Sequence, residues 1–432
     1  MEIIKKSQKY FLLATYLLGC FPILTFATRS ILTIVWSLLG IFVFFVNQKN
    51  YKFKNDIWIF VLPFLILIFS ILYTANTQHG MSSLIKMVSF IIFPFIFYLN
   101  SEFFSTKQIY KILYFFVFSV FIIITYQSIQ VILNYTFITD NITLLEIKSN
   151  GFSALNEISE NKIDQIKIRR FRSFIIEISN THTTYLGLWI CFSIFFLGSE
   201  LKKIKQNSLK SLIIVLIIIL IFWLYLISAR MPLLSLLISS LLTVIIFSDF
   251  SRIKLLKFGL ILFAFLIAGL SFNNPISIRV KEYYDTGLTL LEPNSNMSAF
   301  NSSNVRNGIY YCDLKLIKKS PFFGVGVGDI QDELNKCYSE ELGAKVYSWQ
   351  QYNTHNQYAF FWISSGVIGF LLFVLLIYHL FKKAIKNKNF LFFYFICLTS
   401  LIFFTESLLE RSDGLIFFSF FTSILYFNSL KK

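Results

Sequence analysis

The chain has 432 residues, of which 56% are hydrophobic and 14% are charged, and its formal net charge is +16. Soluble domains average about 25% charged residues, so this composition excludes an ordinary soluble globular protein. Apolar runs of about 20 residues cross a bilayer as helices, because lipid offers no partners for backbone N–H and C=O groups. The sequence therefore predicts an all-α polytopic membrane protein.

Twelve apolar runs predict about 12 transmembrane helices. Their approximate cores are 11–27, 30–46, 57–74, 82–99, 112–133, 183–199, 211–228, 231–248, 256–272, 358–380, 389–405 and 412–428. Lys5, Lys6 and Lys9 precede the first run, but no small-residue cleavage site stands out. We therefore expect a retained first helix rather than a signal peptide.

The basic residues predict the orientation. With an even number of spans both termini lie on one side, together with the short basic connections "KKIK", "SRIKLLK" and "KKAIKNK". The positive-inside rule makes that side cytoplasmic. Because topology accounts for the positive charge, we expect no nucleic-acid partner.

Two long connections divide the chain on the outer face. The expected regions are 1–133 (spans 1–5), a loop at 134–181, 182–272 (spans 6–9), a large loop at 273–357 with amphipathic helices, and 358–432 (spans 10–12). Function tends to reside in such loops. Cys312 and Cys337 share the large loop, where they could form a disulfide in an oxidising compartment or remain two thiols.

The large loop contains a predicted helix and a glycine-rich turn. Residues 305–319 carry apolar side chains at helical spacing, with Ser303 or Asn304 as the expected cap and Arg306 in the first turn. In "GVGVGD", backbone N–H groups could cradle a phosphate, but the pattern favours a plain turn. Asp329 is expected to cap the following helix.

Two histidines are placed where spans begin on the outer face. Thr354 is the expected N-cap of the tenth span, which would put His355 and Asn356 in its first turn. His182 begins the sixth span, after a basic cluster that contains Arg170. Each histidine could serve as a base or could only form hydrogen bonds at the helix end.

Other charged residues lie near or within the predicted spans. Arg230 lies in an outer turn, where it could bind a phosphate or extend to lipid headgroups. Lys86 falls inside a predicted span, where a charge is costly, and could bind an anionic donor, extend to the interface or form an ion pair. Glu406, Glu410 and Arg411 occupy the last outer turn and could be purely structural.

Four segments, "ISARMPLLSLLIS", "VRNGIYYCDLKLIKKSPFFGVGVGD", "YNTHNQYAFFWISSGVIGFLLF" and "TESLLERSDGLIFFSFF", resemble in this order the O-antigen ligase and polymerase superfamily of bacterial envelopes. The resemblance covers about residues 210–425. The motif residues are Ser228, Arg230, Arg306, Pro321, Gly324, Gly326, Gly328, His355, Asn356, Tyr358, Gly366 and Gly369.

The resemblance implies a multi-pass glycosyltransferase of the bacterial inner membrane with its active site facing the periplasm. The donor would be a glycan on undecaprenyl pyrophosphate, the acceptor a hydroxyl of lipid A-core, another glycan or a protein, and no metal or cofactor is expected. His355 would act as general base, while Arg230 and Arg306 would stabilise the leaving pyrophosphate. Further substrate contacts are expected from Arg170, His182, Asn356 and Lys86.

The same motifs occur in ligases and polymerases, which differ in the acceptor. The long final loop favours a ligase. A polysaccharide flippase would also have about 12 spans, but such transporters usually distribute charges through the depth of their helices and show repeat symmetry. Only Lys86 is deep in this sequence, and no repeat is evident.

Overall fold

The computed structural model describes residues 2–46, 55–248, 275–295 and 299–429, and within these ranges the secondary structure is helical, without strands. Seven helices of this described part are long and apolar enough to cross a membrane, and three shorter helices are also apolar. The all-α class is thereby confirmed. The predicted run at 256–272 lies outside the described residues, whereas the other eleven runs fall on described helices.

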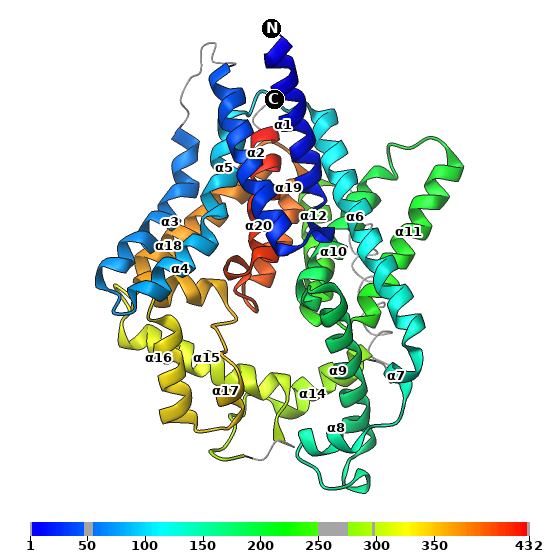
Figure 1. Ribbon diagram of the computed structural model, residues 1–432, viewed down its shortest axis with the longest axis vertical. Coiled ribbons are helices and arrows are strands. Elements are labelled where there is room, and N and C mark those ends of the chain that lie inside the picture. The colour runs from blue at the N-terminus through cyan, green and yellow to red at the C-terminus, as the bar shows by residue number, and fades with distance from the viewer. Residues whose placement is uncertain (1, 47–54, 249–274, 296–298, 430–432) are drawn as a thin grey trace.

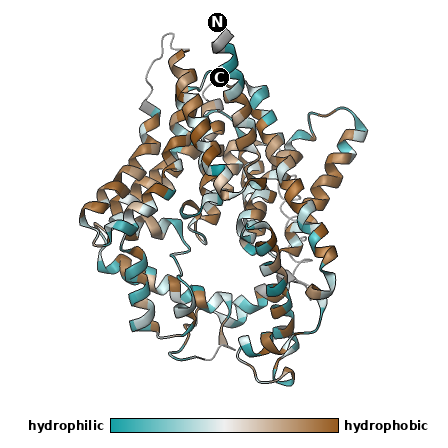
Figure 2. Ribbon diagram, viewed as in Figure 1, coloured by the Kyte–Doolittle hydropathy of each residue, from teal (hydrophilic) through white to brown (hydrophobic). Residues whose placement is uncertain are grey.

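The helices of the membrane region carry the following bounds: α1 Glu2–Gly19, α2 Phe26–Val46, α3 Trp58–Ser70, α4 Thr77–Met87, α5 Ser89–Leu99, α6 Thr106–Leu133, α10 Thr183–Glu200, α11 Asn207–Leu226, α12 Arg230–Phe247, α18 Gln357–Lys386, α19 Phe390–Ile402 and α20 Ser412–Ser429. Hydrophobic residues dominate these helices (Figure 2). Helices α4 and α5 form one apolar stretch that is divided at Val88.

Helix α20 lies in the core of the bundle. It packs against α5 and also contacts α18 and α19. Its Phe417 and Phe421 are fully buried and contact the rings of Phe116 and Phe192 from α6 and α10. Because aromatic pairs of this kind add to the burial of their surface, they hold α20, and the turn that precedes it, at a fixed place.

The two long connections lie at the end of the molecule opposite both termini, which we call the loop end (Figure 1). The first connection forms α7 Tyr135–Thr139, α8 Leu144–Ser149, the 3₁₀ turn η4 Leu155–Glu157 and α9 Glu160–Ser179. The second forms α14 Pro275–Thr286, α15 Ser302–Lys319, α16 Ile330–Cys337, the π-helical turn η6 Tyr338–Leu342 and α17 Val346–Trp349. The connections meet where α9 packs against α14.

Helix α15 confirms the predicted helix in the second connection and corrects its cap. Asn301 is the N-cap, and its Oδ1 accepts hydrogen bonds from the backbone N–H groups of Ser303 and Asn304 at 2.9 Å. Arg306 therefore lies in the second turn of the helix. Cys312 and Cys337 form a disulfide that joins α15 to α16.

The glycine-rich loop binds a break in α18 rather than presenting its N–H groups to a ligand. Backbone N–H groups of Val325 and Gly326 donate to Ile363 O at 2.7 Å and Ser364 O at 3.0 Å. Helix α18 is interrupted directly afterwards, at Gly366, which has a φ of +68°. The interruption frees carbonyl groups of α18, and the loop satisfies them.

Asp329 occupies the N-cap position of α16, as predicted, but its side chain is used elsewhere. Its carboxylate makes no cap hydrogen bond to α16. It accepts instead the backbone N–H groups of Ala75 at 2.8 Å and Asn76 at 2.7 Å, in the turn before α4. Asp329 thus ties the glycine-rich loop to the N-terminal half of the bundle.

We predict that Gly366→Ala destabilises the protein by at least about 2 kcal/mol, because overpacking and a positive φ act together. An added Cβ would lie 2.0 Å from the carbonyl oxygen of Phe322. Thermal unfolding of the full-length protein in detergent checks this. Gly198→Ala, in α10 with no atom within 4 Å of the added Cβ, is the matched control. Equal melting temperatures of the two variants would contradict the prediction.

Candidate active site

Glu406 brings together three segments of the loop end. It lies in the turn 403–411 between α19 and α20, and its side chain is 7% exposed. Its Oε1 accepts a hydrogen bond from Arg306 Nη2 of α15 at 3.0 Å. Its Oε2 lies 3.4 Å from His355 Nδ1, in the segment before α18. One buried carboxylate therefore contacts an arginine and a histidine that are far apart in the sequence.

The groups around Glu406 keep its carboxyl ionised. Burial alone would raise the pKa of the carboxyl, but His355, Arg306 and His182 together lower it to about 2. Opposite charges within a few ångströms favour the ionised form in this way. The site therefore contains a permanent anion that attracts positive side chains.

His355 does not lie in the first turn of α18, contrary to the sequence-based expectation. The helix begins at Gln357, and its cap is Asn356, whose Oδ1 accepts the N–H groups of Tyr358 at 2.9 Å and Ala359 at 3.0 Å. His355 precedes the cap with a φ of +43°. Such a backbone conformation is uncommon outside glycine, and in a non-glycine residue it often marks a functional site.

The His355 ring directs one of its two nitrogens toward Glu406. Nδ1 is buried against Glu406, while the side chain as a whole is 24% exposed. The carboxylate therefore faces one edge of the imidazole. Nε2 lies at the other edge of the ring.

Several hydrogen bonds fix the segment before α18 against the turn 403–411. The hydroxyl groups of Thr354 and Ser407 are 2.7 Å apart, and the backbone N–H of Gln357 donates to Phe403 O at 2.8 Å. The side-chain oxygen of Gln357 accepts the N–H of Leu409 at 2.8 Å. These three hydrogen bonds hold His355 beside Glu406.

Arg230 and His182 border the same region. Arg230 begins α12, and its Nη2 donates to Ser302 Oγ at 3.1 Å, at the start of α15. Arg306 lies one turn after Ser302 on α15. Arg230 is close enough to Arg306 for the two positive charges to repel each other. His182 caps α10, where burial lowers its pKa, and it lies within electrostatic reach of Glu406, Arg306 and His355.

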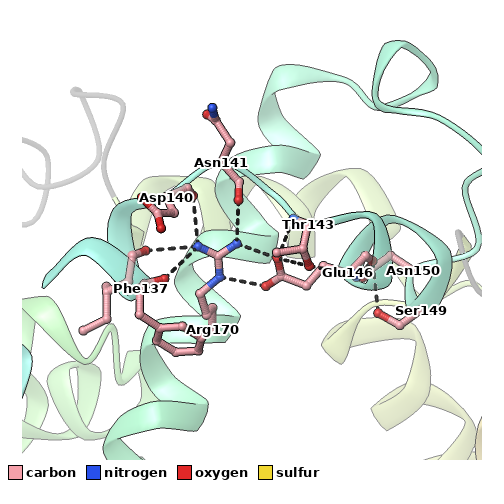
Figure 3. A network of polar contacts seen from close by, with 9 residues as sticks. Phe137, Asp140, Asn141, Thr143, Glu146, Ser149, Asn150 and Arg170 are labelled. Atoms are coloured by element: carbon pink, nitrogen blue, oxygen red, sulfur yellow. Dashed lines mark hydrogen bonds and ion pairs between the residues drawn. The ribbon is translucent and has the colours of Figure 1, made fainter. Parts of the chain in front are cut away.

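Arg170 lies elsewhere and is occupied by protein groups. Its guanidinium donates to both carboxylate oxygens of Glu146, at 2.7 and 2.5 Å, and to backbone carbonyl groups that include Phe137 O and Asp140 O (Figure 3). It thus joins α9 to the start of the first connection. The expectation that Arg170 contacts substrate is not supported by this geometry.

Asn356 and Lys86 make other contacts than the three residues around the Glu406 carboxylate. The Oδ1 of Asn356 is used as the cap of α18. Lys86, near the end of α4, lines a polar cavity of about 100 Å³ together with His79, Asn353 and Glu410. Neither Arg306 nor His355 lines this cavity.

Sequence reasoning missed the two glutamates of the turn 403–411 as site residues. Glu410 accepts a hydrogen bond from Asn353 Nδ2 at 2.9 Å. Burial raises its pKa to about 7, although Ser407, Asn353, Arg411 and Lys86 oppose the shift. The only available signal was the presence of two carboxylates on the face that also carries His182 and His355.

The raised pKa of Glu410 predicts a pH dependence. A carboxyl with a higher pKa in the folded protein loses its stabilising contribution as pH rises from about 4.5 to about 7. Glu410→Gln cannot ionise at this position. We therefore expect the difference in melting temperature between Glu410→Gln and wild type to increase in favour of the variant by a few degrees from pH 5 to pH 8. Thermal unfolding at both pH values measures this difference, and Glu340→Gln, at an exposed position, is the control. A difference independent of pH would contradict the assignment.

The comparison with protein families agrees with the motif order. Residues 214–374 match the model of a family described as O-Antigen ligase. The matched region contains Arg230, Arg306 and His355, and it ends within α18, before Glu406. A search of curated proteins found no match to the chain. The resemblance seen in the sequence is thus confirmed over this region, in which the helical chain is similar to the O-antigen ligase family.

Proposed function

We propose that the protein is an O-antigen ligase-like glycosyltransferase. It transfers a glycan from undecaprenyl pyrophosphate to a hydroxyl of lipid A-core or a similar acceptor, at the periplasmic face of the bacterial inner membrane. One observation carries the proposal: the buried Glu406 carboxylate holds Arg306 at 3.0 Å and His355 at 3.4 Å. This arrangement supplies a base and an anion-binding group side by side.

In the proposed reaction, His355 Nε2 takes the proton of the acceptor hydroxyl while that oxygen attacks the anomeric carbon of the donor sugar. The bond between this carbon and the pyrophosphate oxygen breaks, and the anomeric configuration inverts. The electron pair leaves with undecaprenyl pyrophosphate. Glu406 stabilises the imidazolium that His355 becomes and orients its ring, as the carboxylate of a catalytic triad does.

Arg306 and Arg230 are the proposed partners of the leaving group. Guanidinium groups bind pyrophosphate oxygens with paired hydrogen bonds, and they remain charged throughout the reaction. Arg306 is 30% exposed, so its guanidinium is accessible although one N–H is directed to Glu406. The mutual repulsion of the two arginines decreases when an anion lies between them, which favours the pyrophosphate that forms.

A polymerase of the same superfamily is the alternative, and it differs only in the acceptor. The proposed site serves either reaction, because a glycan hydroxyl and a core hydroxyl present the same group to His355. A flippase is the more distant alternative. The proton-transfer pair His355 and Glu406 favours an enzyme over a transporter.

We predict that His355→Ala reduces the transfer rate by about 10²–10⁴-fold, the usual contribution of a general base. Glu406→Gln reduces kcat by less, because the imidazole remains. Both are measured with the full-length protein, a lipid-linked glycan donor and the acceptor, with Glu340→Gln as control.

A deletion strain complemented with the same variants distinguishes the reactions. Full-length glycan that accumulates on the carrier beside bare core indicates a ligase, whereas a single repeat unit on the core indicates a polymerase. A normal surface-glycan profile with His355→Ala would contradict the proposed site.

A further inference from the structure

A second cavity, of about 170 Å³, lies between the two long connections of the loop end. Residues Gln165, Ile168, Arg169, Arg172, Ser173 and Ile176 of α9 line one side. Glu282 of α14 and Ser302 of α15 line the other. We call it the interloop cavity. None of its lining residues belongs to the proposed proton-transfer pair.

Two contacts connect the interloop cavity to the candidate active site. Ser302, on one wall, accepts the hydrogen bond of Arg230 Nη2 at 3.1 Å. Arg172, on the other wall, donates to Thr183 Oγ1 at 2.6 Å, directly after His182. A molecule in this cavity would therefore lie beside Arg230, which is proposed to bind the pyrophosphate.

The lining chemistry suits a sugar. Carboxylate, amide, hydroxyl and guanidinium groups form hydrogen bonds with ring hydroxyls, and Ile168 and Ile176 offer apolar surface for the C–H face of a pyranose. Ligand sites combine apolar lining with a few polar groups in this manner.

The charges of the cavity favour an acidic sugar. Among the described residues that line the cavity, Glu282 is the only carboxylate beside Arg169 and Arg172, and it already accepts the N–H and the hydroxyl of Ser302 at 3.1 and 3.0 Å. A guanidinium carries five N–H donors, and Arg172 directs one of them to Thr183. Its remaining donors match a carboxylate in paired geometry.

We propose that the interloop cavity binds a carboxylate-bearing sugar residue of the donor glycan, held by Arg172 and Arg169. This inference rests on the proposed function, because it needs a lipid-linked glycan beside Arg230. The first connection would thereby contribute to donor specificity, a role that differs from the chemistry at His355.

Binding of small probes to the full-length protein in detergent tests the proposal. Ligand-observed NMR titrations use D-glucuronate, D-glucose and inorganic pyrophosphate. We expect glucuronate to bind more tightly than glucose, and Arg172→Gln to weaken glucuronate about tenfold, as expected for loss of a charge-assisted pair. Pyrophosphate binding should be unchanged in that variant and weakened in Arg306→Gln.

Arg169→Gln serves as a second variant, since its side chain is exposed and its substitution leaves the Thr183 contact intact. Lys345→Gln, an exposed charge of the second connection, is the control. Equal binding of glucose and glucuronate, or unchanged glucuronate binding in both arginine variants, would overturn the acidic-sugar site. Pyrophosphate binding that is as tight in Arg306→Gln as in wild type would instead overturn the proposed function.

Discussion

The buried carboxylate of Glu406 constrains the loop end of this protein. Removing an ion from water costs several kcal/mol unless close partners of opposite charge compensate. Glu406 is 7% exposed, and the groups that compensate its burial are Arg306 and His355, with His182 further away. If one partner were removed, the carboxylate would remain buried without its compensation. The interaction therefore fixes the relative positions of α15, the segment before α18 and the turn 403–411.

Contacts within the membrane helices support this arrangement. The aromatic contacts of α20 hold one end of the turn 403–411, and a buried ion pair between Arg29 of α2 and Asp413 attaches the start of the same helix. The glycine-rich loop supports the break in α18, whose first turns carry the Asn356 cap. The proposed proton transfer would need such rigid surroundings, because it depends on distances within a few tenths of an ångström.

Composition and hydropathy were sufficient to predict the helical membrane class, and apolar spacing was sufficient to predict α15. These features depend on residues that are close together in the sequence, so they can be predicted without knowledge of tertiary contacts. The helix caps were less predictable, because Thr354, Asn356, Asn301 and Ser303 are all good capping residues, and only tertiary contacts decide between neighbours. Asn356 is the cap because Thr354 is bonded to Ser407.

Long-range partners explain the remaining differences. Arg170 resembled a phosphate ligand, but its partner Glu146 lies 24 residues away, in a loop with no periodic pattern. Glu406 resembled a structural charge, and its partner Arg306 is 100 residues distant. No spacing rule connects such residues, although the ordered family motifs include Arg230, Arg306 and His355, which border one region of the structure.

The most direct test of the central claim is a double-mutant cycle between Arg306 and Glu406, with the transfer rate as the readout. Arg306→Gln, Glu406→Gln and the double variant are compared with wild type. If Glu406 orders the site through Arg306 and His355, the double variant will be little slower than the worse single variant, because coupled residues are strongly non-additive. Additive losses would show that the two side chains act independently and would contradict the account.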